Sequence, residues 1–181
     1  TPGGWFYSST NLTLSEHGGT PLDAPIHLAE GRHTTDQIPL DRLIGPAAVI
    51  DVSKQSTTNR DYRFTVADVE AWERANGRLP DGAILLFHTS FSRHWPNRKR
   101  YMGTDQRGPE AVAKLHFPGL SEELARFLVE QRKVAAVGLD TPSLDYGQSK
   151  DFIVHRTLLG ANIPGFENVA NLDQVPAKGA T

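Results

Sequence analysis

Short apolar runs alternate with polar, glycine- and proline-containing segments along most of the chain. Residues 47–53, 83–87 and 134–139 are predicted as buried strands, because each run is apolar and bounded by polar or turn-forming residues. In residues 6–16 the pattern differs. Phe6, Leu12 and Leu14 stand at even-numbered positions, and the residues at odd-numbered positions are mostly polar. This alternation predicts a half-buried strand.

A second pattern, with helical spacing, follows two of these strands. Thr65 and Asp68 have the spacing of a capping box, Gly77 supplies a stop, and an apolar face lies between them at Val66, Val69 and Trp72. Ser121 is predicted to cap another helix, with Leu124, Phe127 and Leu128 as its apolar stripe. Residues 151–159 are predicted as a short helix that Gly160 terminates, and the tail after it as loop. Strands that alternate with helices indicate an α/β fold.

Length and composition narrow the classes of protein. The 181 residues predict a single domain spanning 1–181, and a start at Thr1 rather than Met leads us to expect that upstream residues have been lost. The net charge of −2 argues against a nucleic-acid partner, and no apolar run reaches the length of a membrane span. The absence of cysteine excludes disulfides and thiol chemistry, and although it does not fix the compartment, we favour the cytoplasm.

The segment from residue 16 to 27 carries the most chemistry in the chain. It holds His17, Asp23 and His27 within eleven positions, in a frame of glycine and proline that stiffens an irregular backbone. Imidazole and carboxylate together suit Zn²⁺, Mn²⁺ or Fe²⁺. Taken singly, His17 and Asp23 are better explained as loop residues that cap backbone amides. Taken with His27, they predict a metal site.

Further candidates lie in the second half of the chain. His155 stands in an apolar segment, where a histidine is more often a satisfied core residue than a ligand. Glu167 lies between apolar neighbours, and burying it unpaired would be costly, so a metal or a base would explain it. Asp140 and Ser143 follow a buried strand, where α/β proteins place binding loops, although a structural turn explains them equally well. The long segment 91–118, with its basic stretch 93–100, lacks periodicity and is predicted to be functional or mobile.

The run from His17 to His27 resembles the signature of the putative cyclase family of metal-dependent amide hydrolases, which includes bacterial kynurenine formamidase and isatin hydrolase. The family pattern is His-x-Gly-Thr-His-x-Asp-x-Pro-x-His, and this chain has His, Gly-Gly-Thr, Pro, Leu, Asp, Ala, Pro, Ile and His in the same order. The resemblance extends to residues 44–46, 116–119, 138–143 and 166–169, and so covers nearly the whole chain.

The resemblance implies a swivelling β/β/α fold, with a mixed sheet and flanking helices. Members of the family are usually homodimers or homotetramers with a Zn²⁺ or Mn²⁺ site. By position, His17 and Asp23 would bind one metal, and Asp23 would bridge to a second metal held by His155 and Glu167. His27 would be the general acid/base.

Pro21 departs from the family pattern, which has a metal-binding histidine there. Proline offers no side-chain donor, so the first site would keep only His17 and Asp23. Asp23, His155 and Glu167 would still form a three-ligand set with an open position.

The leading hypothesis is hydrolysis of an aryl-formamide or cyclic amide, such as N-formylkynurenine or isatin, by metal-activated water. Trp5, Phe6, Asp140 and Ser143 are the candidate substrate contacts. Trp95 is a further possible wall for an aromatic substrate, and packing is the favoured role of the three aromatic residues. The rival hypothesis is a non-catalytic binding protein with a damaged site. A cupin-like metal dioxygenase is disfavoured, because its ligands would lie on strands uninterrupted by capped helices.

Overall fold

In the computed structural model, which describes residues 2–181, six strands form one mixed sheet. Across the sheet they are β1 (Leu22–Asp23), β7 (Gly165–Phe166), β6 (Ala136–Leu139), β4 (Ile84–His88), β2 (Ala47–Asp51) and β8 (Lys178–Ala180). The four inner strands are parallel to one another, whereas β1 and β8 are antiparallel edge strands. The three predicted buried strands are therefore confirmed as β2, β4 and β6, with bounds that differ by a few residues.

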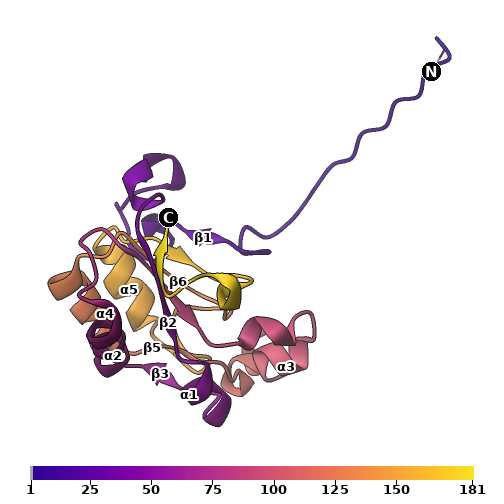
Figure 1. The fold of residues 1–181 in the computed structure, drawn as a ribbon. Helices are drawn as coiled ribbons and strands as arrows, with labels where there is room; N and C mark the ends of the chain where they lie inside the picture. The colour runs from indigo at the N-terminus through magenta and orange to yellow at the C-terminus, as the bar shows by residue number, and fades with distance from the viewer. Residues whose placement is uncertain (1) are drawn as a thin grey trace.

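Three helices gather on one side of this sheet: α2 (Val66–Asn76), α4 (Glu122–Phe127) and α5 (Ile153–Gly160) (Figure 1). The shorter helix α3 (Arg98–Met102) lies away from this group, whereas α1 (Ser53–Thr58) contacts α2 through a hydrogen bond from Gln55 to Asp68. Strand β3 (Arg63–Phe64) pairs in parallel with β5 (Gly119–Leu120). Short 3-10 helices are Pro25–His27, Thr35–Gln37, Leu40–Arg42, Phe91–His94, Pro109–Lys114 and Leu172–Gln174. Helix α4 continues into a π-helical turn at Leu128–Arg132. Among the described residues, no helix has the length and apolar character needed to cross a bilayer.

Local sequence chemistry sets the helix ends as predicted. Thr65 and Asp68 form a reciprocal capping box, and Gly77 ends α2 with φ of 85°. The hydroxyl of Ser121 accepts the backbone N–H of Leu124 at the start of α4. The apolar faces of these helices meet β2, β4 and β6 in the main core, in which the rings of Phe64 and Phe87 stack 4.8 Å apart. This core supports the sheet, and the candidate site lies at the ends of β1 and β7.

Two predictions of the sequence analysis are wrong. The tail predicted as loop contains β7 and β8, which are too short to show any periodicity. The strand predicted at residues 6–16 does not form: these residues are exposed and extend away from the domain as an arm (Figure 1). Alternation shows only which side chains would lie on the same face of a strand. No described strand pairs with this segment, so its apolar side chains have no neighbouring surface to pack against.

Candidate metal centre

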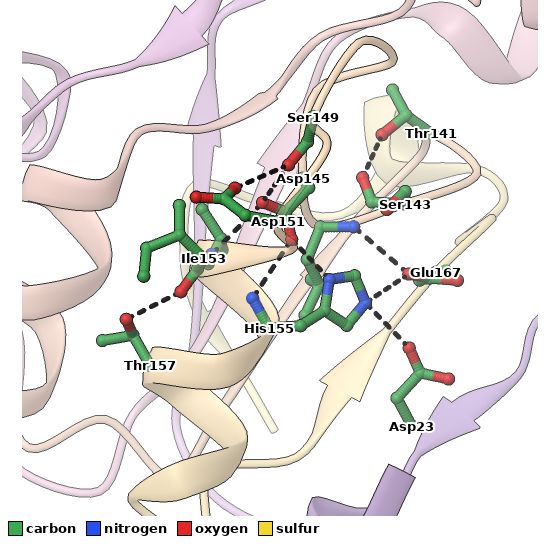
Figure 2. Close-up of polar contacts among 12 residues, drawn as sticks. Asp23, Thr141, Ser143, Asp145, Ser149, Asp151, Ile153, His155, Thr157 and Glu167 are labelled. Carbon is green, nitrogen blue, oxygen red and sulfur yellow. Dashed lines mark hydrogen bonds and ion pairs between the residues drawn. The ribbon is translucent and has the colours of Figure 1, made fainter. Parts of the chain in front are cut away.

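His155 is the central residue of the candidate site. It lies in the first turn of α5 with 3% of its surface exposed. Its Nδ1 is 2.6 Å from Oδ2 of Asp145, and that carboxylate also accepts the backbone N–H groups of Val154 and His155. The ring is thereby oriented so that Nε2 faces Asp23 and Glu167 (Figure 2). A carboxylate behind one ring nitrogen, with the other directed outward, is typical of a metal-binding histidine.

Asp23 and Glu167 reach this ring nitrogen from neighbouring strands. Asp23 ends β1 and pairs with Gly165 of β7, and Glu167 follows β7 directly. Nε2 of His155 is 3.2 Å from Oδ2 of Asp23 and 3.1 Å from Oε1 of Glu167. A side chain at Gly165 would collide with Leu144, whose backbone N–H donates to Glu167. The glycine therefore leaves room for the buried Leu144 side chain against β7.

Burial and charge shift the pKa values of these three groups. Burial disfavours the charged form of His155, but hydrogen bonds with Asp145, Asp23 and Glu167 raise its pKa to about 11. Burial would raise the pKa of Asp23, yet the hydrogen bond and charge of His155 lower it below 3.8. Burial, with the negative charge of Asp23 contributing, raises the pKa of Glu167 above 4.5. In the ion-free protein, the positive charge of the protonated His155 ring therefore balances the neighbouring carboxylates, as the charge of a bound cation would.

A second set of side chains, His17 and His27, lies near Asp23. His27 ends the 3-10 turn Pro25–His27, which hydrogen bonds from His27 N to Ala24 O and from Ile26 N to His33 O hold in place. The rings of His17 and His27 are 4.5 Å apart, and both residues are exposed. Burial chiefly lowers the pKa of His27, so its imidazole is neutral near pH 7.

The residues present fit a divalent metal ion. Candidate ligand atoms of Asp23, His155 and Glu167 lie within 4.8 Å of one another, and all three residues are buried; we call them the inner group. Those of His17, Asp23 and His27 meet the same limit and form the outer group. Asp23 belongs to both, and its Oδ1 is buried without a hydrogen-bond donor. A buried carboxylate oxygen without a partner is costly, and a cation would remove that cost.

Both groups open into one cavity of about 820 Å³. Its apolar wall includes Trp95, Met102 and Phe152, and Arg98 and Arg107 add positive charge. A small aromatic molecule fits this volume, with the ligand atoms at one side of it.

The candidate substrate contacts from the sequence are not all brought to the cavity. Ser143 lines it. Asp140 is fully buried, accepts the backbone N–H and hydroxyl of Thr89, and does not line the cavity. Trp5 and Phe6 lie on the exposed N-terminal arm and are also absent from its lining.

Sequence reasoning missed Asp145 and Phe152. Asp145 comes soon after the β6 turn, and no local pattern links it to a histidine ten residues later. Phe152, at the N-cap of α5 with φ of 50°, packs edge-on to His155 at 6.1 Å and lines the cavity. A large residue held at positive φ beside a site is the kind of strain that marks functional positions, but it is visible only in the structure.

Comparison with known proteins places this geometry in context. The family described as "Putative cyclase" matches residues 2–146. A solved structure of isatin hydrolase A from Labrenzia aggregata, bound to benzyl benzoate, superposes with a TM-score of 0.82 at 35% identity, over 93% of this chain and 66% of the other.

Two further matches agree. Kynurenine formamidase of Salinibacter ruber is 32% identical over 92% of this chain and 66% of its own length. A structure described as a potential metal-dependent hydrolase with cyclase activity has a TM-score of 0.64 at 26% identity, over 92% of this chain and 68% of the other. The chain spans about two thirds of the length of these proteins.

Proposed function

Because the chain belongs to the putative cyclase family, we propose that it is a metal-dependent hydrolase of aryl-formamides or cyclic amides. Isatin-like and N-formylkynurenine-like molecules are the substrate classes, by analogy with the named activities of its relatives. The observation that carries the proposal is the convergence of Asp23 and Glu167 on Nε2 of His155, at 3.2 and 3.1 Å, beside a cavity of suitable size.

The inner group would hold one Zn²⁺ or Mn²⁺ ion, with Asp145 orienting His155 from behind. A divalent ion bound there would polarise the scissile carbonyl and lower the pKa of water towards about 7. His27 faces the same cavity, and its lowered pKa keeps it ready to accept the proton of the attacking water. It would return that proton to the leaving nitrogen as the C–N bond breaks, giving a carboxylate and an amine.

The cavity walls would select for an aromatic amide. Trp95 and Phe152 offer ring faces, and Ser143 offers a hydroxyl. Asp140, bonded to Thr89, would contribute by holding the loop after β6 rather than by touching substrate. Any contribution of Trp5 and Phe6 would require the arm to reach a cavity of another copy in a homodimer or homotetramer.

The test is an amidase assay on metal-depleted protein reloaded with Zn²⁺ or Mn²⁺, using isatin and N-formylkynurenine. We expect hydrolysis only after reloading, with loss of metal and activity in Asp23→Ala. Absence of hydrolysis in metal-loaded protein, together with an unchanged metal content in Asp23→Ala, would reject the proposal.

Pro21 favours one rival, a binding protein that kept the cavity and lost catalysis. Elemental analysis separates the two functions. About one transition-metal ion per chain, removed by a chelator, supports the hydrolase, whereas protein that takes up no ion and still binds an aromatic amide supports the rival.

A further inference from the structure

We propose that the outer group is a second, inhibitory metal site in which His27 supplies the ligand that Pro21 cannot. This inference rests on the proposed function, because it assigns to the same histidine a second and competing role. It predicts that the chain binds two ions and that the second ion inhibits hydrolysis.

The first observation is that the two carboxylate oxygens of Asp23 point to different groups. Oδ2 lies 3.2 Å from Nε2 of His155, on the inner side, and Oδ1 lies 3.3 Å from Nδ1 of His17, on the outer side. The contact with His17 is not aligned as a hydrogen bond, and Oδ1 is buried without a partner. One carboxylate oxygen is thus left unsatisfied and directed at the outer group, although the side chain of Asp23 is only 1% exposed.

The second observation is that Pro21 cannot be a metal ligand. Proline has no side-chain donor, and its backbone carbonyl accepts the N–H of Glu167 at 3.2 Å, which ties it to β7. His27 is the remaining group in place, since its ligand nitrogen lies within 4.8 Å of those of His17 and Asp23. Two imidazoles and a carboxylate make a donor set suited to Zn²⁺.

The consequence follows from the electron pair on the imidazole. A His27 nitrogen that ligates an ion no longer has the electron pair with which to accept a proton from water. The first ion, held by the buried inner group, therefore leaves His27 free, and the second ion removes the base. Activity should rise as the first ion binds and fall as the second binds.

The experiment titrates Zn²⁺ into the metal-depleted full chain by calorimetry, with activity measured on the same samples. We expect two ions in the unchanged chain and one in His27→Gln and in His17→Gln. His33→Gln, a matched loss of an imidazole outside both groups, should still bind two. Two ions in His27→Gln would overturn the inference. Should one of the single variants fail to fold, which thermal melting reports, the other carries the test.

Restoring the family ligand gives the converse result. Pro21→His combined with His27→Gln should regain the second ion, and Pro21→His alone should lose the inhibition by excess Zn²⁺. A wild-type chain that binds one ion at every Zn²⁺ concentration, and loses it in His155→Gln, would overturn this inference and leave the proposed function standing. Activation in step with the second ion would also overturn it. A wild-type chain that binds no ion would reject both.

Discussion

The inner and outer groups share Asp23 and differ in how the fold holds them. His155 and Glu167 are 3% and 5% exposed and are hydrogen-bonded to Asp145 and to the backbone of Leu144. His17 and His27 are exposed and come from a loop and a 3-10 turn. The inner group therefore comes from buried side chains on elements that packing fixes, whereas the outer group adds two exposed imidazoles to the shared Asp23. Pro21, which stands where the family pattern has a histidine, is buried next to β1, and its carbonyl accepts the N–H of Glu167.

Asp23→Asn should have the largest effect, because it damages both groups at once. We expect kcat/KM to fall on the order of 10³-fold, about 4 kcal/mol of transition-state stabilisation. Steady-state assays with isatin, and metal analysis of the same samples, provide the measurement. Full metal content with unchanged kcat/KM would show that this carboxylate serves neither group.

His27→Gln separates the groups. With one ion per chain, we expect the inner ion to remain and kcat to fall roughly 10²-fold, since general-base catalysis contributes that much or more. Metal content and kcat measured together check this. If the single ion were lost with His27, the outer group rather than the inner would be the primary site.

Asp145→Asn should affect only the inner group. Because this carboxylate orients His155 through the 2.6 Å contact, we expect metal affinity to weaken about 10- to 100-fold. The control is Asp61→Asn, which alters a more exposed carboxylate–histidine pair at His116, outside both groups. Equal affinities for the two variants would mean that Asp145 does not position the ligand.

The inner group should also make the stability of metal-free protein depend on pH. The folded-state pKa of His155 is raised to about 11, from 6.5. A raised pKa contributes stability that is fully present below pH 6.5 and is lost as pH rises through about 11. We therefore expect the free energy of unfolding to decline between pH 7 and 11, with a slope of up to about 1.4 kcal/mol per pH unit. Urea unfolding of the wild type and His155→Gln isolates this contribution, and identical profiles would contradict it.

The smallest expected effect concerns the arm. Trp5→Ala and Phe6→Ala should leave KM within about twofold, because neither residue lines the cavity of its own chain. Michaelis kinetics with an aromatic amide check this. A larger rise in KM would show that the arm reaches the cavity of another copy.

The same contrast explains what the sequence could predict. Strands β2, β4 and β6 and the capping box at Thr65 are encoded by local runs and spacings, and the structure confirms them. The inner group depends on β7, a strand of two residues without a periodic signal, and on the long-range pairing of β1 with it. Asp145 was missed for the same reason. The arm shows the opposite error, since its alternation was visible but no surface covers it.

The most direct test is a crystal structure of the protein soaked with one equivalent of Zn²⁺, with the ion located by its anomalous scattering. We expect one peak about 2.0–2.2 Å from Nε2 of His155 and from oxygens of Asp23 and Glu167. An ion bound elsewhere, or a fully occupied site that does not include His155, would contradict it.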